Sequence, residues 1–449
     1  MSLHYELTGN FQYDIGVLGL KLALDTLKKE GKELNYKYSD FTLTIHEERD
    51  EVFKLLLRSL LSLSEEIESK REKEEKDKKK NKEEKDCVKV AKFINNYFLN
   101  FYNPSKLNKL ESIDHLAKDI YQDFNSKASI CQCSFCNATK KAIPINRMYF
   151  LFAPSSMNSF YNNKPSIFIC EDCLLPVIAS PFALANNSTL VYVPNLSLME
   201  SWHTALKDEK NVLKKIVTKL INENHYYAQI VEYRIDSKKP SINIFPLGKT
   251  AIENMKKRAD ILENLLQSAN TSILKDVIYY IATNQSLFTL ILKYVPEIFQ
   301  KYKNDKGSAL YSVNVALLIL KLHLLLTQKE VTKMEVSENL LEEAKKYGES
   351  IHGYIWRTKK GNTAVNYSIS LASALIQSIH LPFTQALENL IRISITTGKA
   401  IPFEIRANIN KENYREVLAA VALSIMSFPE PKEEKEEEKE EAFEESLDD

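Results

Sequence analysis

The sequence predicts an α+β fold in which a mixed N-terminal part with an inserted four-cysteine module precedes an all-helical C-terminal bundle. Strand-like alternation is confined to the first 249 residues, five of the six cysteines fall between residues 131 and 173, and amphipathic helical patterns follow one another from residue 250. We expect, in order, a mixed α/β part, a cysteine module, a strand-containing continuation of the first part, a helical bundle and an acidic disordered tail, at residues 1–130, 131–180, 181–249, 250–429 and 430–449.

The N-terminal part contains both helix and strand signals. Apolar residues recur at helical spacing over residues 11–27, after a turn at Gly9 and Asn10, whereas residues 41–45 alternate like a strand. Residues 87–127 again have a helical pattern. The pattern therefore predicts at least one strand packed with several helices.

A charged insertion interrupts this part at residues 65–86. Nineteen of its 22 residues are charged, ten acidic and nine basic. Mixed charge at this density cannot bury a core, so we expect either an exposed helical extension or a disordered insertion.

Strand signals return after the cysteines. Residues 189–193, 229–235 and 241–245 are apolar or alternating, and residues 236–240 between the last two have the composition of a hairpin turn. From residue 250 the pattern becomes helical, and in the first helix Ile252, Met255, Ala259, Leu262 and Leu266 are expected on one face.

The longest apolar stretch covers residues 309–327. Asn314, Lys321 and His323 interrupt it, which favours a buried helix over a membrane span. The N-terminus lacks the basic start and apolar run of a signal peptide. We therefore expect a cytoplasmic protein that has no membrane partner.

Charge is distributed unevenly although the chain as a whole is neutral. Residues 430–449 hold twelve acidic and three basic residues, a net charge of −9, so residues 1–429 carry +9. A moderately basic body is compatible with a nucleic-acid partner, and the tail is expected to be a solubilising disordered end.

Two Cys-x-x-Cys pairs, Cys133 with Cys136 and Cys170 with Cys173, predict a metal site. Without a secretion signal, disulfides are disfavoured, and four thiolates at about 2.3 Å match the tetrahedral coordination that structural zinc prefers. Four sulfur ligands leave no open position, so this Zn²⁺ would hold structure and would not activate water. The 33 intervening residues would form a long loop whose two ends the ion joins.

Alternatives to this zinc site are unmetallated thiols, an iron–sulfur centre or a redox pair. Cys131 could replace Cys133 as a ligand, although burial as a small apolar side chain is the simpler interpretation of Cys131 and Cys87.

The loop between the pairs is basic and rich in aromatic and amide side chains, and it contains no Asp or Glu. Such side chains can contact phosphates and base edges. For the aromatics, burial in the core is the favoured interpretation, and the asparagines could instead form turns. A second basic cluster lies at an expected break between two helices, where phosphate contact is plausible. The candidate DNA contacts are Lys140, Lys141, Arg147, Asn162, Lys164, Arg357, Lys359 and Lys360.

No catalytic motif is recognisable. Gly248, Lys249 and Thr250 follow a strand like the end of a phosphate-binding loop, but Asn243 replaces the first glycine of that motif. The eight histidines have no metal-ligand spacing. We therefore expect a protein that is not an enzyme.

The paired knuckles, Cys133-Ser-Phe-Cys136 and Cys170-Glu-Asp-Cys173-Leu-Leu-Pro, together with the opening segment Leu7-Thr-Gly-Asn-Phe-Gln-Tyr-Asp-Ile-Gly16, resemble a known family. The chain is similar to the CXXC–CXXC family of CRISPR-associated proteins, large subunits of type I Cascade surveillance complexes of the I-A or I-B kind. The resemblance covers roughly the first 180 residues. The charged insertion and Cys131 are departures from it that do not touch the expected ligands.

This resemblance implies a non-catalytic antiviral-defence subunit that binds guide RNA, target DNA, the Cascade backbone subunits and a helicase-nuclease effector. Such subunits recognise the protospacer-adjacent motif in duplex DNA and stabilise the displaced strand, while guide pairing reads the sequence. Two other interpretations remain open: a stand-alone zinc-stabilised nucleic-acid-binding protein, and a metal-dependent nuclease in which Asp14 and Glu6 would be the first candidates.

Overall fold

The computed structural model describes residues 2–74, 84–98, 101–144, 160–161, 164–165, 167–185, 188–234, 241–327 and 331–427. About 68% of these residues are helical and the strands form small sheets, so the fold is α+β with a helical C-terminal region. The chain divides into two compact units: unit 1 is Met1–Lys219 with His225–Gly248, and unit 2 is Leu220–Asn224 with Lys249–Asp449.

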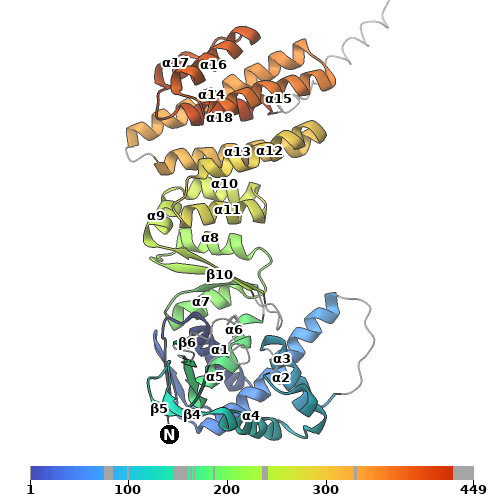
Figure 1. Cartoon of the computed structure of the whole chain (residues 1–449), viewed down its shortest axis with the longest axis vertical. Coiled ribbons are helices and arrows are strands. Elements are labelled where there is room, and N and C mark those ends of the chain that lie inside the picture. Colours follow the sequence, from blue (N-terminus) through green and yellow to red (C-terminus); the bar gives the residue numbers. More distant parts are fainter. Residues whose placement is uncertain are drawn as a thin grey trace, which may run out of the picture. The chain divides into compact units, whose positions relative to one another are not determined.

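All described strands belong to unit 1 (Figure 1). They are β1 (Leu3–Glu6), β2 (Tyr36–Tyr38), β3 (Thr42–Ile45), β4 (Ser129–Gln132), β5 (Thr139–Pro144), β6 (Phe160–Tyr161), β7 (Lys164–Pro165), β8 (Phe168–Cys170), β9 (Thr189–Tyr192), β10 (Ala228–Arg234) and β11 (Ser241–Leu247). The helices here are α1 (Phe11–Lys29), α2 (Arg49–Glu74), α3 (Asp86–Tyr97), the 3₁₀ helix η1 (Pro104–Lys109), α4 (Ile113–Lys127), α5 (Glu171–Ala179), α6 (Pro181–Leu184), α7 (Leu196–Leu206) and most of α8 (Val212–Asn222).

Three antiparallel sheets of three strands each organise unit 1, in the orders β1-β3-β2, β4-β5-β8 and β11-β10-β9. The alternation expected over residues 41–45 forms β3, in which Leu43 and Ile45 are buried. The expected strands near residues 229–235 and 241–245 pair as β10 and β11, while the turn expected at residues 236–240 lies outside the described residues.

Helix α1 lies at the centre of unit 1 and is buried along most of its length. The Asn10 side chain caps it by accepting a hydrogen bond from the Tyr13 backbone N–H at 3.1 Å. Glycine is required where α1 meets α5, because a Cβ built on Gly16 would lie 2.3 Å from the Pro176 carbonyl oxygen. At Gly19 the same test gives 2.2 Å to the Ala179 carbonyl oxygen. The two helix backbones therefore touch directly.

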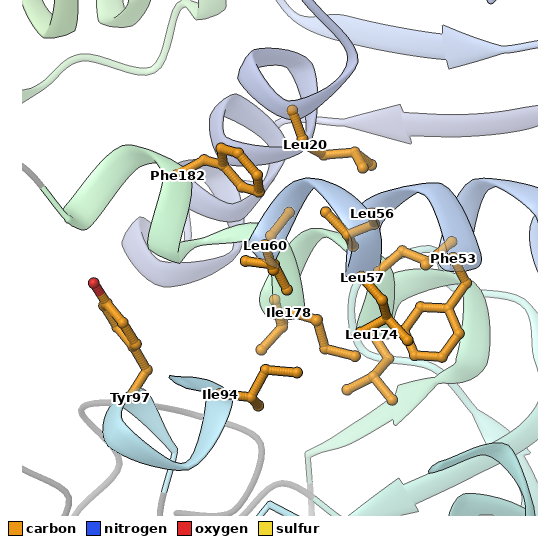
Figure 2. Packing of buried hydrophobic residues seen from close by; sticks show 14 of the residues in the cluster. Leu20, Phe53, Leu56, Leu57, Leu60, Ile94, Tyr97, Leu174, Ile178 and Phe182 are labelled. Atoms are coloured by element: carbon orange, nitrogen blue, oxygen red, sulfur yellow. The ribbon is translucent and has the colours of Figure 1, made fainter. Parts of the chain in front are cut away.

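Helix α2 covers α5 with an apolar face, as Figure 2 shows for Phe53, Leu57 and Leu60 beside Leu174 and Ile178. The same cluster of buried side chains continues into α1, α3 and α6 and includes three of the four paired cysteines. The cysteine-bearing segment thus shares the core of unit 1.

The charged insertion is helical in its described first part, because α2 continues to Glu74. Residues 65–70 lie on this exposed extension, in which only Ile67 is partly buried. Residues 75–83 lie outside the described residues, and α3 begins at Asp86.

Unit 2 is helical throughout its described residues. Its helices are α9 (Lys249–Lys257), α10 (Ala259–Ser268), α11 (Thr271–Ala282), α12 (Leu287–Asn304), α13 (Lys306–Thr327), α14 (Val331–Thr358), α15 (Gly361–Ser378), α16 (Phe383–Thr397), α17 (Phe403–Asn408) and α18 (Tyr414–Ile425). The expectation of one helix from Ile252 to Leu266 is wrong, because the backbone leaves helical geometry at Arg258. The Arg258 guanidinium donates a hydrogen bond to the Leu325 carbonyl at 3.2 Å, a contact that local spacing does not reveal.

Helices α14 and α18 pack side by side (Figure 1). Gly348 makes this approach possible, since a Cβ there would lie 2.5 Å from the Val421 carbonyl oxygen. Two buried histidines are satisfied within the bundle: His352 Nδ1 is 2.8 Å from the Ile425 carbonyl, and His323 Nε2 is 3.4 Å from a Glu416 carboxylate oxygen.

Residues Ser308–Thr327 of α13 are long and apolar enough to span a membrane by length and composition, and 56% of that window is buried. A buried core helix of a soluble protein can have the same length and composition, so this helix by itself does not indicate a membrane span.

Candidate metal centre

The first Cys-x-x-Cys pair lies in the turn that joins β4 to β5. Asn137 has φ of 58°, a left-handed conformation that asparagine tolerates, and its backbone N–H donates to the Cys133 carbonyl at 3.0 Å. The Cys133 N–H in turn donates to the Ala138 carbonyl at 3.0 Å. These bonds close a tight knuckle that brings both sulfurs to one side.

The second pair lies where β8 runs into α5. Cys170 is the N-cap residue of α5, and Cys173 lies in its first turn. The positive end of the helix dipole and its free N–H groups stabilise thiolates at this position. Strand β5 pairs with β8 in a register that sets Ala142 opposite Cys170, so the sheet closes the long loop and brings the knuckles together.

The four sulfurs of Cys133, Cys136, Cys170 and Cys173 lie within 4.8 Å of one another. The Cys136 and Cys170 sulfurs are 3.7 Å apart, and no disulfide joins any of the cysteines. A tetrahedron with metal–sulfur bonds of about 2.3 Å has sulfur–sulfur edges of about 3.8 Å. The donor set therefore fits one tetrahedral metal ion, and the four cysteines could bind it.

The four thiols cannot ionise independently at this spacing. Hydrogen bonds from the Cys170 and Cys173 thiols lower the pKa of Cys133 far below the ordinary 9.0, and the Cys136 and Phe135 backbone N–H groups lower it further. The contacts with Cys133, Cys136 and Cys170 raise the pKa of Cys173 far above 9.0. A bound cation would replace these shared protons.

Neither remaining cysteine joins the cluster. Cys131 lies on β4 with its thiol directed to the Ser129 carbonyl at 3.7 Å, and Cys87 is buried in α3. Cys133, rather than Cys131, is therefore the sulfur that lies with the other three.

Comparisons with known proteins name no relative. No family model, curated protein or solved structure matches the chain.

Charged side chains surround the second knuckle. The Arg49 guanidinium pairs with Glu171, approaches Asp172 at 3.9 Å and stacks on the Tyr121 ring at 4.9 Å. The Lys140 ammonium pairs with Asp172 at 2.7 Å. Burial alone would lower the pKa of Lys140, but the Asp172 carboxylate outweighs it and raises that pKa above the ordinary 10.5. Two cations thus stand beside a cluster that would carry net negative charge with a divalent ion bound.

The basic loop residues have different environments. Lys140 points to Asp172, as described, whereas Lys141 is exposed and donates to the Asn125 side-chain oxygen at 3.0 Å. Lys164 belongs to β7, which pairs with β6, while Arg147 and Asn162 lie outside the described residues. Of this set, Lys141 is the described side chain that is most open to a partner.

The second basic cluster lies in unit 2, at the junction of α14 and α15. Arg357 is exposed and donates from Nε to the Gly353 carbonyl at 3.0 Å, and the Lys359 ammonium lies 4.5 Å from the Tyr367 ring centroid. Lys360 is exposed at the N-cap of α15, and its side chain makes no capping hydrogen bond. The structure thus brings these three residues to one helix junction in unit 2, separate in sequence and unit from the knuckles.

The two candidates for a nuclease centre, Asp14 and Glu6, lie in different environments. Asp14 is fully buried, and its carboxylate accepts hydrogen bonds from the Thr8 N–H and hydroxyl, the Gly9 N–H and the Tyr192 hydroxyl. Burial raises the pKa of Asp14 above 3.8, although these hydrogen bonds partly oppose the shift. Glu6 is exposed at the end of β1. The carboxylate of Asp14 therefore orders the turn before α1.

Sequence reasoning missed the side chains that support the cluster. The Tyr13 hydroxyl donates to the Cys173 sulfur at 3.7 Å, and Arg49 and Asp172 form the ion pairs described above. Asp172 could have been suspected from its place inside the second knuckle. Tyr13 and Arg49 are more than 120 residues from their partners in the second knuckle, and no local pattern points to them.

Proposed function

We propose that this protein is the large subunit of a type I CRISPR Cascade-like surveillance complex, and that one structural Zn²⁺ occupies its four-cysteine cluster. In this role it recognises the protospacer-adjacent motif in duplex DNA and stabilises the displaced strand, without catalysis of its own. Its partners are guide RNA, target DNA, the Cascade backbone subunits and a helicase-nuclease effector, and its place is the cytoplasm.

One observation carries the proposal: the segments that resemble the large-subunit family are in contact. The opening segment Leu7–Gly16 ends 117 positions before Cys133 in sequence. In the structure, however, the Tyr13 hydroxyl contacts Cys173 and Gly16 packs against the Pro176 carbonyl. A chance likeness of two unrelated segments does not require such contact. The likeness therefore falls on one physical unit, the junction of α1, α5 and the knuckles.

The chemistry of the cluster supports a structural role for the metal. Cys133, Cys170 and Cys173 are at most 1% exposed, and four sulfurs complete a tetrahedron, so no position remains for water or substrate. Zinc is the ion that this ligand set selects most often in proteins. The ion would join β4, β5, β8 and α5 to the core of unit 1.

DNA contact is assigned to exposed basic side chains around the loop and at the α14–α15 junction. Of the candidate residues that the structure describes, Lys141, Arg357 and Lys360 have exposed side chains. Arg147, Asn162 and Lys164 stay candidates from composition. Lys140 has a different role in this scheme, because its ammonium faces Asp172 beside the metal ligands.

A matched pair of variants separates these roles. Lys141→Ala should weaken motif-dependent duplex binding by the assembled complex and leave zinc content unchanged, and Asn162→Ala with Lys164→Ala should do the same. Lys140→Ala should lower zinc retention directly, with any loss of DNA binding following from it. Equal DNA binding by the Lys141, Asn162 and Lys164 variants and the parent protein would remove these residues from the DNA interface.

The function itself is tested by affinity purification of the tagged protein from its native host, followed by sequencing of the bound RNA. Short RNAs with one constant repeat-derived end, recovered with several other proteins, would support the surveillance-complex role. Recovery of the protein alone, or with heterogeneous RNA, would contradict it and support a stand-alone zinc-stabilised nucleic-acid-binding protein.

A further inference from the structure

Tyr13 touches both knuckles from a separate helix. Its side chain is 2% exposed, its hydroxyl donates to the Cys173 sulfur at 3.7 Å, and its ring stacks on Phe135 with centroids 4.7 Å apart and planes 15° from parallel. Phe135 lies between Cys133 and Cys136 in the first knuckle. One residue in the first turn of α1 therefore contacts the first pair through its ring and the second pair through its hydroxyl.

The Tyr13 hydroxyl donates its hydrogen bond to a buried sulfur. Four thiolates around a divalent ion carry a net charge of −2, and Cys173 is 1% exposed, so little water can solvate its share of that charge. A donor directed at a coordinated sulfur draws electron density from it. The hydrogen bond therefore stabilises the negatively charged, coordinated form of the sulfur where water cannot.

We propose that Tyr13 is a positioning residue of the metal centre, whose hydroxyl holds the Cys173 thiolate in its coordinated form and so controls metal release. The inference rests on the proposed metal centre and assigns to α1 a task that the knuckles do not perform alone. Loss of the hydroxyl removes this hydrogen bond from the Cys173 sulfur, and metal release should then begin at this ligand.

Tyr5 supplies a matched control. It is 1% exposed, and its hydroxyl has no hydrogen-bond partner among the described residues. Burial raises the pKa of Tyr5, and the nearby Asp172 and Cys173 raise it further, so its hydroxyl lies in the same neighbourhood. Tyr5→Phe removes a buried hydroxyl near the cluster without removing a bond to sulfur. Phe135→Leu removes the ring stack and leaves the Tyr13 hydroxyl in place.

The experiment compares full-length parent, Tyr13→Phe, Tyr5→Phe and Phe135→Leu proteins. The rate of zinc transfer to a chromogenic chelator is measured for each, together with the sulfur-to-metal charge-transfer absorption after Co²⁺ substitution. Tyr13→Phe should weaken metal affinity about 10- to 100-fold and shift the Co²⁺ band to lower energy, because the sulfur becomes more electron-rich. The two control variants should keep the parent band.

Equal release rates and equal bands for Tyr13→Phe and Tyr5→Phe would overturn the role of Tyr13 while leaving the zinc centre intact. A parent protein that binds neither zinc nor Co²⁺ would overturn the metal centre and this inference with it. The RNA content of the purified complex reports on the surveillance function independently of both results.

Discussion

Replacement of Gly16 by alanine tests whether the metal centre depends on the contact between α1 and α5. A Cβ at this position would lie 2.3 Å from the Pro176 carbonyl oxygen and 2.6 Å from its carbon. Real Cβ atoms essentially never approach closer than 3.0 Å, so the backbones must separate by at least about 0.7 Å. Because the neighbour is backbone, no side-chain rotation can relieve the clash.

The cost follows from two opposing terms. Overpacking of a close-packed core costs up to about 3 kcal/mol, while alanine in a helix is favoured over glycine by about 1 kcal/mol. We expect a net loss of about 2 kcal/mol, which lowers the unfolding midpoint of unit 1 by about 4–8 °C. Displacement of α5 also moves Cys170 and Cys173, and metal ligands tolerate only about 0.2 Å of error, so zinc affinity should fall as well.

The unfolding midpoint, by calorimetry, and the zinc affinity, by transfer to a chelator, would be measured for Gly16→Ala and for two control variants in α14. In Gly348→Ala the added Cβ would lie 2.5 Å from the Val421 carbonyl oxygen, so this variant should destabilise unit 2 without loss of zinc affinity. Gly353→Ala meets only the end of the Arg357 side chain, at 3.6 Å, and should stabilise by up to about 1 kcal/mol. If Gly16→Ala behaved like Gly353→Ala, with an unchanged or higher midpoint and normal zinc affinity, the coupling of α1 to the centre would be refuted.

Two further predictions concern metal removal and pH. All six cysteines precede residue 174 and so belong to unit 1, and chelation of the metal should therefore lower the unfolding temperature of unit 1 strongly and leave that of unit 2 unchanged. Calorimetry and limited proteolysis can resolve the two transitions. A parallel loss of both transitions would contradict this prediction. Burial, and after it the Lys207 charge, lowers the pKa of His203 below 6.5. As the pH falls, the unfolded chain therefore binds the proton before the folded chain does, and unit 1 should lose stability below pH 6.5. His203→Gln should flatten that pH dependence at fixed zinc occupancy, and an unchanged slope would show that another group causes it.

Local sequence patterns predicted the structural features that depend on residues close together in the sequence. Helical spacing over residues 11–27 corresponds to α1, alternation gave the strand at Leu43 and Ile45, and the paired spacing of the cysteines predicted a four-sulfur cluster. Each of these signals is complete within a few residues, because backbone geometry sets the periodicity and the knuckle.

Contacts between distant segments were not predictable in this way. The β5–β8 pairing that closes the 33-residue loop, the bond from Tyr13 to Cys173 and the ion pair of Arg49 with Glu171 all join residues more than 20 positions apart. Gly16 shows the same limit: in sequence it is a weak point in a helix, and only the proximity of Pro176 explains it. The break at Arg258 likewise depends on a partner, Leu325, in another helix.

The central claim is that Cys133, Cys136, Cys170 and Cys173 bind one zinc ion, and elemental analysis combined with native mass spectrometry of the full-length protein tests it most directly. The proposed zinc site predicts one zinc per chain, retained in Cys131→Ser and lost in Cys170→Ser. A metal-free parent protein, iron in place of zinc, or loss of zinc in Cys131→Ser would contradict the claim.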